Sequence, residues 1–167
     1  METKAIGQRI LILGCPGSGK GTFARALAAR TGLPLVHLDN IWWRADGTHI
    51  PREEFDRALD GLLRGEQWIM DGDYSRTYGV RVRACDTVFF LDYPEAVCMA
   101  GIRARVGQMR PDIPWTESTL DPELVAQVQN YARDNRPQVL SLLQSYPEKH
   151  SVIFTSRAQA AAWLSRL

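Results

Sequence analysis

Five short apolar runs recur along the chain, separated by longer segments in which polar residues dominate. The runs are RILILG at 9–14, LPLVHL at 33–38, WIM at 68–70, TVFFLD at 87–92 and SVIFT at 151–155. Apolar runs of this length are typical of buried strands, and strands that alternate with helices build parallel sheets with helices on both faces. The pattern therefore predicts an α/β fold around a five-stranded parallel sheet.

The segments between these runs carry helix signals. After Pro51, apolar residues follow the helical spacing i, i+3, i+4, i+7, i+8 at Phe55, Ala58, Leu59, Leu62 and Leu63. Pro94 begins another helix, and Asp121-Pro122 pairs a capping residue with proline at the first helical position. Because proline disrupts a helix interior, Pro137 is expected to kink or split the helix that follows.

One segment, GQMRPDIPWTEST at 107–119, lacks any periodicity. Two prolines and several capping residues mark it as a loop or lid, and residues 107–118 are called the lid below. No repeat, low-complexity tract or linker interrupts the rest of the chain. We therefore predict a single domain over residues 1–167.

Composition and charge exclude several classes of protein. The 167 residues include 20 basic and 19 acidic side chains, and a net charge of +1 gives no general attraction to nucleic acid or anionic membranes. Three cysteines without a C-x-x-C spacing favour neither a disulfide framework nor a zinc site. There is no signal-peptide run and no membrane-length apolar stretch. We expect a cytoplasmic monomer or weak homodimer whose partner is a small molecule, not nucleic acid.

The strongest motif, GCPGSGKGT, follows the first apolar run. Its glycines permit a tight turn that points successive N–H groups at an anion, and the next helix directs its positive N-terminus to the same point. The motif fits the phosphate-binding consensus G-x-x-x-x-G-K-[ST] except at its last position, where Gly21 stands and Thr22 follows. The predicted nucleotide-binding residues of this loop are Gly14, Pro16, Gly17, Ser18, Gly19, Lys20, Gly21 and Thr22. Lys20 is also the first predicted catalytic residue.

The motif resembles the adenylate kinase group of P-loop kinases, in which glycine commonly follows the lysine. The whole chain is similar to adenylate kinase-like proteins described as DNA topology modulation proteins. The shared blocks are HLD at 37–39 with the tryptophans that follow, WIMDGDYS at 68–75, Arg81 with CDT at 85–87, LD at 91–92 and RPD at 110–112. The chain departs from that group at Gly21, where serine is more common, and at Asp73, where asparagine is usual.

This resemblance implies a three-layer α/β/α P-loop NTPase fold of the nucleotide and shikimate kinase type. The implied strand order is 2-3-1-4-5, with an acceptor-binding segment at 40–65. The implied reaction is transfer of the γ-phosphoryl group of ATP, with Mg²⁺, to a nucleoside or nucleoside monophosphate. Two alternatives stay open: a hydroxylated metabolite as acceptor, as in shikimate and gluconate kinases, or a nucleotide-dependent regulator of DNA topology without kinase activity. Arg157 follows the last strand, where adenylate kinases hold the adenine.

Phosphoryl transfer needs a metal-holding carboxylate, an acceptor site and cations over the migrating group. Asp71 ends the third strand, and the resemblance places it beside the phosphate loop as a substrate- and metal-binding residue, with Thr22, partly through water. Asp39 ends the second strand, at the edge where ligands of parallel sheets collect, so it is expected to orient or deprotonate the acceptor. Trp42 and Trp43 follow, and one of them, with Trp43 as the candidate, either stacks on a base or packs in the core.

All but three of the basic residues are arginines, which suit planar contacts with phosphate. Arg103 and Arg105 lie two apart on a predicted helix and point in different directions, so at most one is expected to reach the phosphates. By the resemblance, this helix and the lid carry the arginines that close over the transferred group. We predict Arg103 and Arg110 as catalytic, with Arg105 in reserve.

Other arginines flank the acceptor side. Arg76 and Arg81 follow Asp71 in the turn YSRTYGVR and are candidates, with Tyr74, for binding an acceptor's phosphate or carboxylate. Arg133 and Arg136 share a helix face and form either a second clamp or a solvated pair. The three histidines form no nucleophilic or metal-binding group and are expected to be structural or surface residues.

Overall fold

The computed structural model describes residues 5–167. Its strands form one parallel sheet in the order β2-β3-β1-β4-β5, which confirms the predicted fold class and strand order. The strands are β1 (Arg9–Gly14), β2 (Leu35–His37), β3 (Trp68–Asp71), β4 (Thr87–Leu91) and β5 (His150–Phe154). β1 and its neighbour β4 are almost entirely buried, as expected for central strands of a sheet covered on both faces.

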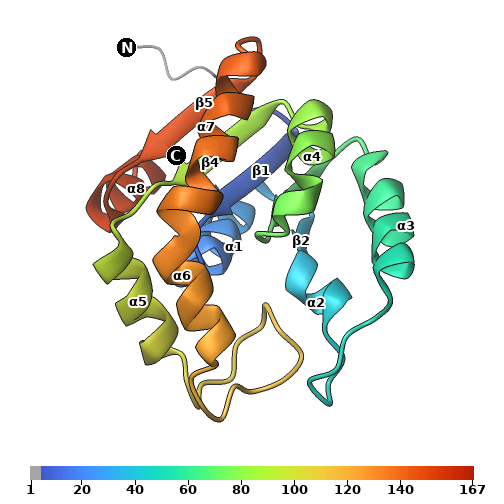
Figure 1. Ribbon diagram of the computed structural model, residues 1–167. Helices are drawn as coiled ribbons and strands as arrows, with labels where there is room; N and C mark the ends of the chain where they lie inside the picture. The colour runs from blue at the N-terminus through green and yellow to red at the C-terminus, as the bar shows by residue number, and fades with distance from the viewer. Residues whose placement is uncertain (1–4) are drawn as a thin grey trace.

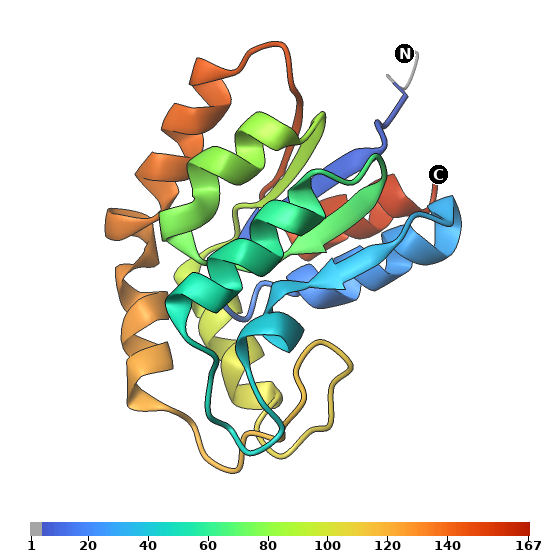
Figure 2. The ribbon, with the colours of Figure 1, turned by 90° about the vertical axis from the view of Figure 1, so that its right-hand side faces the viewer.

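Helices cover both faces of this sheet. They are α1 (Lys20–Thr31), α2 (Leu38–Trp42), α3 (Arg52–Leu63), the 3-10 turn η1 (Ser75–Thr77), α4 (Tyr78–Ala84), α5 (Glu95–Ala104), α6 (Pro122–Asp134), α7 (Arg136–Ser145) and α8 (Arg157–Leu164). α1 and α8 lie on one face, and α4 and α7 lie on the other (Figures 1 and 2). The molecule is therefore a three-layer α/β/α sandwich.

The helix signals in the sequence correspond to observed helix ends. Pro51 and Pro94 are the N-caps of α3 and α5, and the Asp121 carboxylate caps α6 by accepting a hydrogen bond from the Glu123 N–H. The expected break at Pro137 falls at Asn135, where α6 ends and α7 begins. Local capping chemistry thus determines where these helices begin and end.

The carboxyl edge of the sheet carries the segments that matter for function. The phosphate loop follows β1, α2 follows β2, and the lid extends from α5 to α6 beyond the same edge (Figure 2). In parallel α/β sheets, ligands bind beyond this edge. Among residues 5–167, no helix has the length and apolar character needed to cross a bilayer.

Candidate active site

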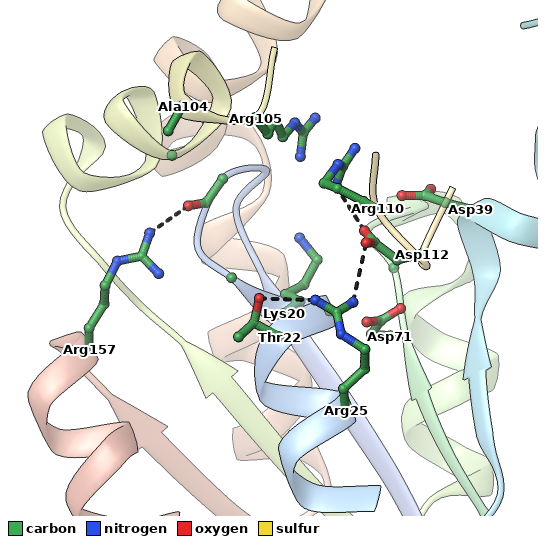
Figure 3. Close-up of a pocket in the computed structure, with 15 residues that line it drawn as sticks. Lys20, Thr22, Arg25, Asp39, Asp71, Ala104, Arg105, Arg110, Asp112 and Arg157 are labelled. Carbon is green, nitrogen blue, oxygen red and sulfur yellow. Dashed lines mark hydrogen bonds and ion pairs between the residues drawn. The ribbon is translucent and has the colours of Figure 1, made fainter. Parts of the chain in front are cut away.

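A cavity of about 280 Å³ opens at the carboxyl edge of the sheet, between the phosphate loop, the lid and the ends of β2 and β3 (Figure 3). Its lining residues are Gly17, Gly19, Lys20, Gly21, Thr22, Arg25, Asp39, Asp71, Gly72, Gly101, Ala104, Arg105, Arg110, Asp112 and Arg157. Three carboxylates and five cationic side chains thus meet in one pocket. Such a balance suits an anionic ligand that also carries a metal ion.

The phosphate loop has the backbone conformation that its glycines permit. Gly17 and Gly19 have φ angles of 82° and 93°, which side-chain-bearing residues rarely adopt. The loop also lies directly against α5, since a Cβ on Gly17 would be 2.1 Å from the Cys98 carbonyl oxygen and one on Gly101 would be 2.0 Å from the Gly17 oxygen. Lys20 Nζ donates hydrogen bonds to the Gly14 and Cys15 carbonyl oxygens, at 2.9 and 3.2 Å.

Asp71 lies at the end of β3 beside this loop, and a histidine holds it there. His37, at the end of β2, is in register with Asp71, and its Nδ1 lies 3.0 and 2.9 Å from the two carboxylate oxygens. Both residues are buried. The sequence analysis expected the histidines to be structural or surface residues, and His37 is buried in a structural role: its contact with this pocket carboxylate fixes the orientation of Asp71.

Asp39 does not end the second strand, as the sequence predicted: β2 ends at His37, and Asp39 enters the pocket from the first turn of α2, opposite Lys20 (Figure 3). The Tyr74 hydroxyl donates a 2.6 Å hydrogen bond to its carboxylate. Burial raises the pKa of the Asp39 carboxyl above its ordinary value, although the Tyr74 hydrogen bond and the Lys20 charge both lower it. A carboxylate in this state is a better proton acceptor than a solvated one.

The arginines over the pocket come from α5, the lid and α1. Arg105 and Arg110 line the cavity, while Arg103 is exposed on α5 and does not, so the structure favours the reserve candidate over Arg103. The reason is the helix end: α5 stops at Ala104, and Arg105 is its C-cap, where the chain turns inward. Burial lowers the pKa of Arg105, and the charge of Arg110 lowers it further.

The two arginines that the sequence predicted to bind the acceptor form hydrogen bonds and ion pairs with other groups of the protein. Arg81 is fully buried, and its guanidinium donates to the backbone carbonyls of residues 72–74 and to Thr77 Oγ1. Arg76 forms a bidentate ion pair with Asp56 of α3, with N–O distances of 3.1 and 2.8 Å. Arg81 is therefore corrected to a structural residue that holds the turn after Asp71, and Arg76 does not line the cavity.

Other predicted residues also lie outside the cavity lining. Tyr74 contacts the site only through the hydrogen bond from its hydroxyl to Asp39. Trp43 packs edge-on against Trp115 of the lid, with ring centroids 5.5 Å apart. Gly14, Pro16 and Ser18 of the phosphate loop are buried and do not line the cavity. Arg133 pairs with its neighbour Asp134, and Arg136 pairs with Asp92, so these two arginines form no second clamp over the pocket.

Arg157 closes the side of the phosphate loop that faces β5. Its guanidinium donates to the Gly17 and Ser18 carbonyl oxygens, each at 2.9 Å, and lies 5.7 Å from the ring centroid of Tyr93. Beside it runs an open, mainly apolar groove that shares three residues with the phosphate pocket. The groove is lined by Pro94, Val97, Ala100, Gly101, Ala104, Thr155, Ser156 and Arg157. The two hollows are therefore adjacent.

Two pocket residues, Arg25 and Asp112, were not singled out from the sequence. Asp112 belongs to the RPD block, and Arg25 lies four residues after Gly21 and three after Thr22, so helical spacing could have placed it on the same face as these loop residues. Within the described residues, no three His, Cys, Asp or Glu side chains form a metal-binding group. Thr22 and Asp71 both line the pocket and offer the hard oxygen ligands that Mg²⁺ prefers.

Comparisons with known proteins bear on the fold of the chain. No family model matches the chain. An adenylate kinase of Thermotoga neapolitana is 27% identical over 94 residues, which cover 54% of this chain and 42% of that protein. The chain therefore aligns with less than half the length of this curated relative.

Solved structures match over nearly the whole chain at low identity. A shikimate kinase of Acinetobacter baumannii in complex with shikimate superposes with a TM-score of 0.64 at 17% identity, covering 96% of this chain and 90% of its own. A gluconokinase of Sinorhizobium meliloti gives a TM-score of 0.57 at 17% identity, covering 98% and 94%. The chain thus has the fold of the small P-loop kinases.

Proposed function

We propose that the protein transfers the γ-phosphoryl group of ATP to a hydroxyl group of a small acceptor. The observation that carries this proposal is the pocket itself, in which the Asp39 carboxylate lies across a single cavity from Lys20, Arg105 and Arg110. A phosphate-binding loop alone would suit many nucleotide-binding proteins. A partly shielded carboxylate opposite that loop is what a phosphoryl acceptor requires.

The chain's own residues divide the work. The backbone N–H groups of the phosphate loop and Lys20 bind the phosphates, and Arg105 and Arg110 neutralise charge that develops on the migrating group. The Nε of Arg110 is buried and has no hydrogen-bond partner among the described residues. Thr22 and Asp71 would hold Mg²⁺, which supplies charge neutralisation on the phosphate oxygens when it is bound.

The acceptor side favours a hydroxyl compound over a nucleoside monophosphate. Asp39 accepts a hydrogen bond there, which suits a neutral hydroxyl donor and disfavours a second anion. Arg76 and Arg81, the arginines offered by the sequence for an anionic acceptor, are both engaged with other partners. A nucleoside or a hydroxylated metabolite therefore fits this pocket better.

The test is ADP formation from ATP and Mg²⁺ across a panel of nucleosides, nucleoside monophosphates and hydroxy acids. We expect a hydroxyl acceptor to stimulate turnover, with Lys20→Ala as the control that removes it. If no acceptor raises ADP formation above the rate with water alone, the kinase proposal fails. Salt-dependent DNA binding by the same sample would then favour the nucleotide-dependent regulator of DNA topology that the sequence resemblance raises.

The apolar groove beside Arg157 is the proposed site of the adenine. Ala100→Phe, on the exposed face of α5, should fill it and weaken ATP binding about tenfold or more, as expected for a packing conflict of about 1–3 kcal/mol. Binding of inorganic tripolyphosphate, which lacks the base, should stay unchanged. Calorimetric titration of both ligands gives the comparison, with Ala132→Phe on the exposed face of α6 as control. If Ala100→Phe weakened the binding of ATP and of tripolyphosphate equally, the adenine would not lie in this groove.

A further inference from the structure

The charged side chains of the lid are turned inward and paired with one another. Arg110 Nη1 lies 2.8 Å from an Asp112 carboxylate oxygen, and Arg110 Nη2 lies 3.4 Å from Glu117. Glu117 also forms an ion pair with Arg105, in which a Glu117 carboxylate oxygen lies 3.0 Å from the Arg105 Nε. The side chains of Arg110, Asp112 and Glu117 are only 18%, 13% and 13% exposed, so these pairs are far less solvated than surface ion pairs.

Asp112 also joins the lid to the helix that carries the phosphate loop. Its second carboxylate oxygen lies 3.3 Å from Arg25 Nη1 on α1, and Arg25 Nη2 lies 3.3 Å from the Thr22 hydroxyl (Figure 3). Asp112 thus contacts one arginine on each side of the pocket. Arg25 and Asp112 are 87 positions apart in the sequence, so their pairing fixes the lid relative to α1.

Gly21 makes room for this contact. A Cβ at residue 21 would lie 3.2 Å from Asp112 Cγ, from one of its carboxylate oxygens and from Arg25 Nη1, tighter than ordinary carbon contacts. The missing side chain lets the carboxylate approach the first turn of α1, where the helix dipole favours an anion. The glycine that breaks the phosphate-binding consensus therefore lies where the lid meets the loop.

We propose that Asp112 is a positioning residue that docks the lid onto α1 at Gly21 and holds Arg110 over the site of phosphoryl transfer. This role rests on the proposed function. Loss of the carboxylate should free the lid and misplace Arg110, which lowers kcat. It also removes a negative charge from a phosphate pocket, so the affinity for ATP should be unchanged or higher. A separation of kcat from affinity distinguishes positioning from a general loss of folding.

The docking is tested without nucleotide or acceptor. The three native cysteines are buried, so spin labels can be placed on Met109→Cys in the lid, which is 90% exposed, and on Arg30→Cys in the last turn of α1. Double electron–electron resonance should give one narrow distribution of the distance between the two spin labels in this protein. Asp112→Asn should lengthen and broaden it, and Arg25→Gln should do the same from the other partner. Asp60→Asn, which alters an exposed ion pair on α3, should not.

The positioning role is tested by kinetics. Asp112→Asn should reduce kcat about 10- to 100-fold without raising the Kd for ATP, and Asp112→Glu should recover part of the loss. Unchanged label distances in both Asp112→Asn and Arg25→Gln would overturn the docking, and an unchanged kcat would overturn the positioning of Arg110. If the parent protein shows no acceptor-stimulated turnover, the proposed function fails, and the label distances still decide whether Asp112 docks the lid.

Discussion

Replacing Asp39 with asparagine is expected to lower kcat for phosphoryl transfer about 10²- to 10⁴-fold, the range for loss of a general base. Asparagine keeps the shape of the side chain and can hydrogen-bond to Tyr74, but it cannot accept the proton of the attacking hydroxyl. The Kd for ATP should change little, since Asp39 lies on the acceptor side of the pocket. Steady-state rates and ATP titrations on the same sample measure both quantities.

The same substitution is expected to raise the melting temperature at neutral pH. Because burial raises the pKa of Asp39, the folded protein holds this proton more readily than the unfolded chain, and ionisation near neutral pH opposes folding. This loss of folding free energy is absent below the ordinary carboxyl pKa of 3.8, where Asp39 is protonated in both states. It grows as the pH rises from 3.8 towards the raised pKa of the folded protein. The gain in melting temperature should therefore be largest at neutral pH and should vanish in acid.

Tyr74→Phe provides a second measurement of the same carboxylate. The Tyr74 hydrogen bond lowers the pKa of Asp39, so its removal should move the acid limb of the kcat profile to higher pH. Asp60→Asn on the surface of α3 serves as the control for both properties. Full activity in Asp39→Asn would show that Asp39 is not the base of the reaction. A lower melting temperature of this variant at neutral pH would contradict the claim that the buried Asp39 charge destabilises the fold.

Replacing Arg81 with methionine is expected to reduce the free energy of unfolding by about 3 kcal/mol or more, because several buried hydrogen bonds to a charged group are lost together. Methionine has a similar length but leaves the carbonyl oxygens of residues 72–74 without their donor. Burial lowers the pKa of the Arg81 guanidinium to about 10, so it stays charged at neutral pH. Urea unfolding, with the m-value as a check on two-state behaviour, measures the loss.

The loss should extend to the active site. Tyr74 has a φ of 43°, a left-handed conformation that a tyrosine rarely adopts, and its carbonyl is one of the acceptors of Arg81. Without Arg81 this turn should relax and withdraw the Tyr74 hydroxyl from Asp39. Arg83→Met, on the exposed side of α4, is the matched control. A change in stability of less than about 1 kcal/mol would show that Arg81 does not hold this turn.

The features predicted well from the sequence depend on regular periodicity. Buried strands appear as apolar runs, and parallel strands bring their carboxyl ends to one edge, so Asp39 and Asp71 could be placed together before any coordinates. The phosphate loop is similarly local, because its glycines, Lys20 and the following helix are contiguous in the chain. For these features, sequence neighbours are also spatial neighbours.

The features predicted poorly depend on where an element ends or on distant partners. Arg103 and Arg105 were expected on one helix, whereas α5 ends at Ala104 and Arg105, its C-cap, lines the pocket. Arg81 lies close to Asp71 in sequence, but η1 and α4 carry it beneath the turn. The pairing of Arg25 with Asp112 joins residues 87 positions apart and leaves no periodic signal in the sequence.

The close approach of Gly17 and Gly101 determines which parts of the molecule can move as units. No side chain separates the phosphate loop from α5 at this contact, so no rotamer change can absorb a displacement between the two backbones, and we expect them to move as one unit. The hinge of the lid must then lie beyond Ala104, where Gly107 has a φ of 76°. Because the Gly107 N–H also donates to the Glu117 carbonyl oxygen at 2.7 Å, the two ends of the lid are joined at this point, and we expect them to move together.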